Sequence, residues 1–429
     1  MLNKLNFKRI TFLVYGLGSS GQSTVKYLKN KNFNYRVWDD NTILRNKFKN
    51  KKVLNLLKSL KNVDFIVLSP GISLKKTKYK NYLLKYKKKI ITDIDLLYLI
   101  NKKFRSIVVT GSNGKSTTCK IITHLLKKNK YNVELGGNIG TPVLNLKIKK
   151  NTFLVIEASS FQLSHSKFIQ PDFSILLNIT KDHLDWHGSM QEYIESKLKI
   201  FNLQSKKDFA LINKKFKKNF KDKKYLSKLI PLKLKSYKRV QAQIGNKYLK
   251  SIINEENMNF VYTLSKLLKI SDKSFVSSMN TFVGLPHRYE IFLKRKNITF
   301  INDSKATSFE ACKFALASDK NIYWILGGLP KYKDKINLKY LKKNIIKSYI
   351  IGKNINHFKK QLKNNVDFFT TKDLKNSILT ILKDIRISKK RNHIVLLSPG
   401  AASFDQFKNF ETRGNEFKKL CKIYAKKYI

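Results

Sequence analysis

The chain has 429 residues, of which 42% are hydrophobic, and its formal net charge is +60. This length predicts two or three domains, and because no apolar run reaches about 20 residues we expect no membrane-spanning helix. The apolar part of the first 16 residues is only a strand-length run before a glycine turn, so we expect no signal peptide. The charge is typical of nucleic-acid-binding proteins, but it comes almost entirely from lysines spread along the chain, with only ten arginines, so we interpret it as a compositional bias and expect no nucleic-acid partner.

The N-terminal region alternates between apolar runs and helix-like segments. The runs RITFLVYG, NYRVWDD and VDFIVLSPGI, at residues 9–16, 34–40 and 63–72, predict three buried strands. The first is followed by Gly16-x-Gly18-x-x-Gly21 and a helix-like segment, which is the position of a nucleotide-binding glycine turn. The same glycines would also serve a tight turn and close helix packing without any ligand, and the sequence leaves both possibilities open.

The middle region contains a candidate phosphate-binding loop, VTGSNGKSTT, between a predicted strand at 106–111 and a predicted helix. It lacks the first glycine of the usual G-x-x-x-x-G-K-[ST] pattern, so a chance Gly-Lys-Ser is the alternative. Backbone N–H groups around Gly111 and Gly114, the helix N-terminus and the Lys115 ammonium would still hold phosphate, while Ser116 or Thr117 would offer a hydroxyl to Mg²⁺. We therefore predict an ATP-binding loop.

Polar residues follow two further predicted strands of this region, at 151–159 and 173–180. Glu157 ends the first, where a carboxylate beside the phosphate loop is suited to Mg²⁺. His183 follows the second, between Asp182 and Asp185, and is either a metal ligand or a structural histidine. Residues 190–201 predict a helix, on which Lys197 is an ordinary surface lysine by pattern alone.

A third region begins after GLPHRYE at 284–290. Predicted strands at 297–304, 321–328, 347–353 and 393–400 each end in turn residues. Strands that alternate with helices indicate an α/β fold built on open, mainly parallel sheets. The Lys-rich segment 201–250 has little pattern and predicts nothing specific.

Taken in chain order, the motifs of all three regions resemble those of the Mur ligase family. The resemblance covers nearly the whole chain and is weakest over 201–250. SSFQL, NDSKATS and DQFKNFETRGNEF point to the members of the family that add D-glutamate. The matching segments are GLGSSG at 16–21, SPGI at 69–72, TGSNGKST at 110–117, GGNIGTP at 136–142, EASSFQL at 157–163, NITKDHLD at 178–185, GLPHRYE at 284–290, INDSKATS at 301–308 and LSPGAASFDQFKNFETRGNEF at 397–417.

The resemblance implies three α/β domains, each on a mainly parallel sheet with flanking helices. They would be a Rossmann-like domain for the UDP substrate at 1–93, a central P-loop ATPase domain at 94–284 and a Rossmann-like amino-acid-binding domain at 285–429. The implied reaction is ATP-dependent ligation of D-glutamate to UDP-N-acetylmuramoyl-L-alanine through an acyl phosphate, in peptidoglycan precursor synthesis. The resemblance also implies Mg²⁺ at two sites, while the protein itself mainly positions the reactants and neutralises charge.

The resemblance also implies residue roles around ATP. Lys115, His183 and Lys197 would be catalytic, and Lys197 would carry a carbamate that makes it an anionic metal ligand. The Mg²⁺ ligands would be Ser116, Glu157, His183 and the modified Lys197. The ATP contacts would be Gly111, Ser112, Asn113, Gly114, Lys115, Ser116, Thr117, Asn254, Arg288 and Asp303.

Two further sets of residues would bind the other substrates. A dicarboxylate such as D-glutamate needs cations and hydroxyl groups, which the C-terminal motifs supply. The implied UDP-substrate contacts are Ser19, Ser20, Ser69, Gly71, Asn138, Ser159 and His183, and the implied D-glutamate contacts are Lys305, Thr307, Lys331, Ser403 and Phe410.

Two alternatives remain at this point. A folylpolyglutamate synthase-type ligase would share the ATPase core without needing the N-terminal GLGSSG domain, and a basic NTP-dependent nucleic-acid-binding protein would account for the charge. The three cysteines are far apart and form no C-x-x-C pair, which favours a reducing compartment over a disulfide framework or a zinc site. We expect a monomer in the cytoplasm.

Overall fold

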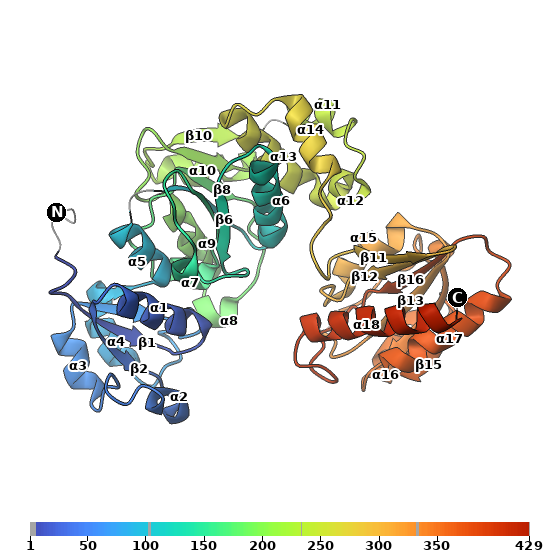
Figure 1. Cartoon of the computed structure of the whole chain (residues 1–429), viewed down its shortest axis with the longest axis horizontal. Helices are drawn as coiled ribbons and strands as arrows, with labels where there is room; N and C mark the ends of the chain where they lie inside the picture. The colour runs from blue at the N-terminus through green and yellow to red at the C-terminus, as the bar shows by residue number, and fades with distance from the viewer. Residues whose placement is uncertain (1–5, 102–103, 233, 332–333, 429) are drawn as a thin grey trace. The chain divides into compact units, whose positions relative to one another are not determined.

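The computed structural model describes residues 6–101, 104–232, 234–331 and 334–428. The chain forms two compact units, Met1–Phe282 and Val283–Ile429 (Figure 1). The first unit contains a four-stranded and a six-stranded sheet, and the second unit contains another six-stranded sheet. The predicted fold class is confirmed, since all three sheets are mainly parallel and flanked by helices. In the described ranges, no helix has the length and apolar character needed to cross a bilayer.

The first sheet is entirely parallel and has the order β2-β1-β3-β4. The strands are β1 (Thr11–Tyr15), β2 (Asn34–Trp38), β3 (Phe65–Leu68) and β4 (Ile90–Ile91). Helix α1 (Ser19–Asn30) begins directly after the glycine turn. A Cβ on Gly21 would lie 1.8 Å from the Gly16 carbonyl oxygen, so the turn requires glycine there for close packing, as one of the two sequence interpretations holds. The other helices of this part are α2 (Thr42–Asn46), α3 (Leu56–Asn62) and α4 (Lys80–Lys85).

The second sheet is parallel in the order β10-β9-β8-β5-β7-β6 and lies in the same unit. Its strands are β5 (Arg105–Thr110), β6 (Val133–Gly137), β7 (Phe153–Glu157), β8 (Phe173–Leu176), β9 (Phe209–Ile212) and β10 (Lys228–Pro231). The candidate phosphate loop connects β5 to helix α6 (Lys115–Lys128). Because β5 is a central strand, the loop lies at the middle of the carboxyl edge of the sheet, where ligands of open α/β folds bind.

The remaining helices of the first unit complete its layers. Helix α9 follows the predicted helical pattern, and a single 3₁₀ turn at Lys199–Phe201 extends it. The helices are α5 (Asp93–Ile100), α7 (Ser160–Ser164), α8 (Leu184–His187), α9 (Met190–Leu198), α10 (Lys217–Asp222), α11 (Leu234–Gln241), α12 (Lys247–Lys250), α13 (Ile252–Leu267) and α14 (Asp272–Asn280).

The third sheet has the order β11-β12-β16-β13-β14-β15, and only β11 runs antiparallel to its neighbour. Its strands are β11 (Glu290–Arg295), β12 (Ile298–Asn302), β13 (Ile322–Gly327), β14 (Ile345–Ile351), β15 (Phe368–Lys372) and β16 (His393–Leu397). Its helices are α15 (Phe309–Ser318), α16 (Ile355–Leu362), α17 (Leu374–Ile387) and α18 (Phe410–Tyr428).

Two hydrophobic clusters cover the opposite faces of the third sheet. Tyr323 of β13 packs with α17 and α18, whereas the next residue, Trp324, packs with α15 and α16. Cys421 belongs to the first cluster and Cys312 to the second, and both are free, fully buried thiols, as is Cys119 of α6. Because both faces of this sheet are buried, the sequences of its strands are continuous apolar runs.

The expected domain boundaries after residues 93 and 284 stay predictions. The first falls at the start of α5, whose Thr92 cap forms a reciprocal capping box with Asp95. The second lies two residues beyond the end of the first compact unit, Phe282.

Candidate active site

The loop at residues 111–114 is hydrogen-bonded to the segment that follows β8. The backbone N–H of Asn113 donates to the Asn178 side chain (2.8 Å), and the N–H of Ser112 donates to the Asn178 carbonyl (2.9 Å). The Ser112 hydroxyl is buried against Thr180 and the Tyr193 hydroxyl (2.8 Å). The side chain of Ser112 therefore fixes the loop. The backbone N–H groups in the first turn of α6, which includes Ser116 and Thr117, point toward the N-terminal end of that helix.

Gly114 caps α6 in a left-handed conformation, with φ of 82°. A Cβ there would lie 2.3 Å from the Asn257 side-chain oxygen, so this position requires glycine and Asn257 lies directly against the loop. The predicted ATP contact Asn254 is buried one helical turn away, where it donates to the Tyr248 carbonyl (2.9 Å) and lies 3.4 Å from Asn257. Asn257 is thus closer to the loop than the residue that the motif indicated.

Two lysines converge on one carbonyl oxygen of the loop. Lys115 Nζ lies 2.9 Å and Lys197 Nζ 2.8 Å from the Gly111 oxygen, and Lys115 also donates to the Ser112 carbonyl (2.8 Å). Only 1% of Lys197 is exposed, so the surface position indicated by its helical pattern is wrong: α9 turns this side chain toward the loop. Burial first, and then the Lys115 charge, lower the pKa of the Lys197 amine to about 7, against the opposite effect of Asp182.

Glu157 ends β7 beside the loop, in register with Val109 of β5. Its side chain is 2% exposed, and one carboxylate oxygen, Oε1, accepts from the Asn138 side chain (2.9 Å). The other oxygen, Oε2, is buried without a hydrogen-bond partner. A buried carboxylate oxygen left unpaired next to a phosphate loop fits a Mg²⁺ ligand.

The described residues form no cluster of three or more His, Cys, Asp or Glu side chains that would hold a metal by itself. Mg²⁺ usually binds through one or two carboxylates, with phosphate oxygens and water completing the octahedron. Glu157 with the Ser116 hydroxyl therefore fits a Mg²⁺ that arrives with a nucleotide.

His183 caps the short helix α8 in a left-handed conformation, with φ of 53°. Its ring lies 4.7 Å from the Phe161 ring, and its Nε2 is 3.3 Å from Asp182. The Tyr193 ring lies 6.5 Å from His183, and Lys197 Nζ lies 4.6 Å from the centre of the same tyrosine ring. Tyr193 thus connects the histidine segment, the buried lysine and the loop.

The expected UDP-substrate residues are divided between the two sheets of the first unit. Ser19 and Ser20 form the first turn of α1, and Ser69 donates to the Gly16 carbonyl (2.8 Å) close by. Gly71 is exposed in the turn after β3. Ser159 and Asn138 instead follow β7 and β6 of the second sheet, and Ser159 caps α7 through a reciprocal bond with Gln162.

Two expected ATP contacts, Arg288 and Asp303, belong to the second unit. The Asp303 carboxyl is buried and accepts from the Ser398 hydroxyl (2.7 Å) and the Tyr289 N–H (3.0 Å). Burial raises its pKa to about 7 in spite of these hydrogen bonds and of the Arg288 charge. The Arg288 Nε is buried without a hydrogen-bond partner.

The expected D-glutamate residues follow three strands of the same sheet. Lys305 Nζ lies 4.7 Å from the centre of the Phe410 ring, and Ser403 is buried after β16. Thr307 is half-buried in the segment between Asp303 and α15, and Lys331 is exposed after β13. The structure thus brings Lys305 and Phe410 into contact and leaves Lys331 on the surface.

Sequence reasoning missed one buried arginine of this region. Arg413 is 1% exposed and donates to the Ser304 hydroxyl and carbonyl (3.0 and 2.9 Å), the Ala401 carbonyl (3.0 Å) and the Gly327 carbonyl (3.4 Å). It ties together the segments that follow β12, β13 and β16. The sequence signal was available, since Arg413 is one of only ten arginines and lies inside a matched motif.

The chain was compared with protein-family profiles and with curated proteins. Residues 109–323 match the Mur ligase middle domain, and residues 10–90 match the Mur ligase MurD-like N-terminal domain. A protein of Rickettsia felis named UDP-N-acetylmuramoylalanine--D-glutamate ligase is 35% identical over 438 residues, covering 96% of this chain and 97% of that protein. A protein of the same name from Rhizobium meliloti is 32% identical and covers 97% of both chains.

Solved structures with the same architecture include two from Thermotoga maritima. MurC, named UDP-N-acetylmuramate-alanine ligase, has a TM-score of 0.56 at 14% identity and covers 98% of this chain and 100% of its own. MurF ligase in complex with ADP has a TM-score of 0.55 at 17% identity and covers 98% of both chains. These two likenesses concern the fold. The profile matches and the full-length relatives establish that the chain belongs to the Mur ligase family.

Proposed function

We propose that this Mur ligase joins D-glutamate to UDP-N-acetylmuramoyl-L-alanine, with ATP as the energy source, in the synthesis of peptidoglycan precursors. The observation that carries the ATP-dependent chemistry is the buried Lys197 amine beside Lys115 at the Gly111 carbonyl. The acceptor and the amino acid are supported by the full-length similarity to proteins named UDP-N-acetylmuramoylalanine--D-glutamate ligase.

The loop and the first turn of α6 would hold the ATP phosphates. On nucleotide binding, the Lys115 ammonium would exchange its hydrogen bonds to the Gly111 and Ser112 carbonyls for phosphate oxygens, which are stronger acceptors. Ser116 and Glu157 would hold one Mg²⁺, and His183 with Lys197 a second; the metal would neutralise charge on the transferred phosphoryl group. Asn254, Arg288 and Asp303 would contribute further contacts to ATP.

Lys197 is suited to become a carbamate. A pKa of about 7 leaves a large fraction of the amine neutral at physiological pH, and only the neutral amine attacks CO₂. The neutral amine forms a bond to the carbon of CO₂ and releases one proton to solvent, which gives an anion. Counted from the ammonium form, two protons are lost and a cation becomes an anion. The carbamate would then be drawn to Lys115 and to Mg²⁺, and it would no longer compete for the Gly111 carbonyl.

The chemical sequence is an acyl transfer in two steps. The terminal carboxylate of the UDP substrate attacks the γ-phosphorus of ATP, which forms an acyl phosphate and releases ADP. The amine of D-glutamate then attacks the acyl carbon, and inorganic phosphate leaves as the amide forms. Phosphorylation is needed because a carboxylate oxygen is a poor leaving group, and Lys305, Thr307, Lys331, Ser403 and Phe410 would position the amino acid.

An acceptor assay tests the proposal. The protein is incubated with ATP, Mg²⁺ and D-glutamate, with either UDP-N-acetylmuramoyl-L-alanine or a folate as acceptor, and ADP release is measured. We expect ADP only with the UDP substrate, and we expect L-glutamate to replace D-glutamate poorly. ADP release only with the folate would overturn the proposed acceptor while retaining the ATP-dependent ligase chemistry.

A trapping experiment tests the acyl phosphate separately. Hydroxylamine in place of D-glutamate should yield a hydroxamate of the UDP substrate, because it attacks the same activated carbonyl. Turnover with D-glutamate but no hydroxamate would contradict this intermediate.

The same proposal includes a monomer acting in the cytoplasm. The three free, buried thiols are compatible with a reducing compartment. Light scattering coupled to size-exclusion chromatography should give the mass of one chain, 50.1 kDa, with and without nucleotide.

A further inference from the structure

A cavity of about 560 Å³ is lined in part by Glu192, Glu195 and Ser196 of α9, whereas Lys197 of the same helix donates to the phosphate loop. One wall comes from the segment between β3 and β4, and the other from α7, α8 and α9, so both walls belong to the first unit. None of the residues expected to bind ATP, Mg²⁺ or the UDP substrate lines it. The lining of the cavity therefore shares no residue with the site described above.

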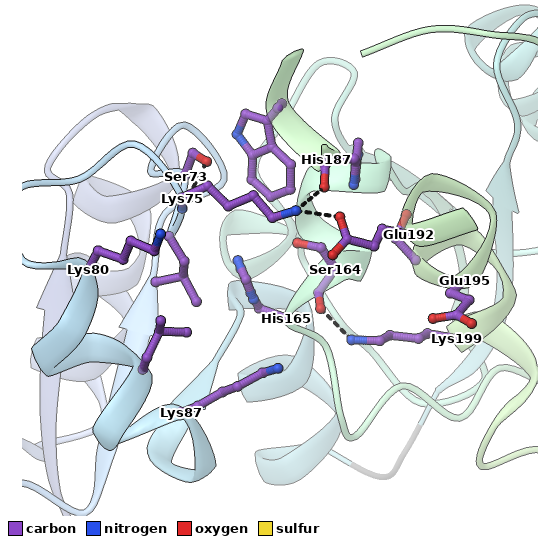
Figure 2. A pocket seen from close by; sticks show the side chains of 14 residues that line it. Ser73, Lys75, Lys80, Lys87, Ser164, His165, His187, Glu192, Glu195 and Lys199 are labelled. Carbon is purple, nitrogen blue, oxygen red and sulfur yellow. Dashed lines mark hydrogen bonds and ion pairs between the residues drawn. The ribbon is translucent and has the colours of Figure 1, made fainter. Parts of the chain in front are cut away.

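Figure 2 shows how the charged side chains enter this cavity. Lys80 and Lys87 come from one wall, Glu192, Glu195 and Lys199 from the other, and His165 lies between them. Lys75 reaches across from the first wall and pairs with Glu192 (2.5 Å), which neutralises both groups.

The remaining charge in the cavity is predominantly positive. Among the described residues, no carboxylate lies within ion-pair distance of Lys80, Lys87 or Lys199. Lys199 donates instead to the neutral carbonyl of Ser164, and Glu195 lies 3.9 Å from Lys223. In a chain so rich in lysine, cations around one cavity have little meaning without a second observation.

The His165 ring gives an independent indication that the cavity binds a ligand. Its Nε2 is buried and has no hydrogen-bond partner. Burial, together with the charges of Lys199, Lys87, Lys167 and, least, His187, lowers the pKa of the ring to about 4. A buried ring nitrogen without a partner costs free energy unless a ligand or water satisfies it. As an N–H donor among lysines, it is complementary to an anion.

The cavity also has an apolar side. Leu74, Leu84 and Trp186 contribute to its lining, and the Trp186 ring lies 6.0 Å from the His165 ring. Ligand sites commonly combine such apolar surface with a few convergent polar groups. Inorganic phosphate alone would leave this surface without a contact.

We propose that this cavity binds a compact organic anion, a phosphate or carboxylate attached to a small apolar group, through Lys87, Lys199 and the His165 ring. The anionic group would lie between the two lysines and accept from His165. The apolar group would pack against Trp186 and the two leucines. This inference does not depend on the proposed reaction.

Calorimetric titration tests the proposal in the full-length protein. ADP and Mg²⁺ are kept at saturation so that the phosphate loop is filled, and phenyl phosphate, benzoate and inorganic phosphate are titrated separately. We expect one of the two aromatic anions to bind at least tenfold more tightly than inorganic phosphate, and the better of the two identifies the anionic group. Absence of binding by both aromatic probes would overturn the proposal.

Matched variants locate the binding. Lys87→Gln and Lys199→Gln should each weaken the aromatic probe at least fivefold, whereas the neighbouring Lys88→Gln, outside the lining, should not. Glu195→Gln, which removes a negative charge from the lining, should tighten binding, an effect that general loss of structure cannot produce. Equal affinity in all four variants would overturn the assigned site.

Two further measurements distinguish this site from others. The NMR signals of the His165 ring, assigned with His165→Gln, should titrate with the probe, and the ring pKa should rise because a nearby anion favours the imidazolium. Saturating UDP-N-acetylmuramoyl-L-alanine should leave the affinity unchanged. Displacement by that substrate would mean that the cavity is part of the substrate site, and the proposal of a separate site would fail.

Discussion

The two units both gather polar side chains at the carboxyl edge of a parallel sheet, but they satisfy those side chains differently. In the first unit, Glu157 keeps an unpaired buried oxygen, and Lys197 is held by a carbonyl that it shares with Lys115. In the second unit, Arg413 makes four hydrogen bonds and Asp303 accepts two. Incomplete bonding, which the Arg288 Nε also shows in the second unit, is typical of groups that await a ligand, whereas the bonding of Arg413 is typical of a group that holds the fold.

Lys197→Ala gives the sharpest test of the first half of this comparison. We expect kcat/KM to fall at least about 1000-fold, or about 4 kcal/mol, because the metal-binding carbamate cannot form. ADP release measures the loss, and short carboxylates such as acetate should restore part of it. The exposed Lys206→Ala is the control, and full activity of Lys197→Ala would show that the buried amine serves only packing.

Arg413→Met tests the second half. The substitution leaves the carbonyls of Ser304 and Ala401 without their donors, so we expect the second unit to lose about 3 kcal/mol of stability. Hydrogen exchange of the β12 and β13 amides measures this loss, with the exposed Lys422→Met of the same helix as control. Unchanged protection would mean that the arginine is held in reserve for a ligand.

Glu157→Gln separates a ligand-binding role from a structural one. We expect kcat/KM to fall about 100-fold and the Mg²⁺ concentration needed for half-maximal rate to rise, because an amide is a poor ligand for this ion. Thermal stability should not fall, since the lost oxygen had no partner and the Asn138 bond to the other oxygen can persist. Glu134→Gln, on the neighbouring strand β6, is the matched control, and a loss of stability with intact activity would reverse the assignment.

Asp303 gives the smallest expected effect, through pH. Its pKa is raised from 3.8 to about 7, so the folded protein binds more protons than the unfolded chain between these values. The stability of the second unit should therefore fall as pH rises from about 4 to about 7 and then level off.

Urea denaturation at each pH, monitored by hydrogen exchange of amides in the second unit, measures this dependence of stability on pH. Asp303→Asn should flatten it, while the exposed Asp367→Asn should leave it as in the unmodified protein. A profile that rises with pH through the same window would show that the Asp303 carboxylate, once ionised, is stabilised by its partners.

Much of the fold could be predicted because its central strands are buried on both faces and appear as continuous apolar runs. Strands β9 and β10 could not, since each has only four residues within a segment dominated by lysine. The antiparallel strand β11 is largely half-exposed and lacks such a run. The glycine loop and the strand-end Glu157 were found from local pattern, because a strand that enters a turn places both at one edge of the sheet.

The contacts between distant segments could not be found in this way. The burial of Lys197 depends on how α9 packs against Gly111, 86 residues away, and no helical periodicity contains that information. Asn257 and Asn178 reach the loop by the same kind of tertiary approach. Lys197 was singled out only through the family resemblance, against its pattern.

The three cysteines are built-in reporters of local unfolding, because the rate at which each thiol is labelled depends on how often its surroundings open. Each is completely shielded from water, so an alkylating reagent reaches a thiol only when the helix around it separates from its sheet. Cys119 reports the sheet that carries the phosphate loop, while Cys312 and Cys421 report opposite faces of the sheet in the second unit. Timed labelling of the unmodified protein therefore measures, without any added probe, which layer opens first.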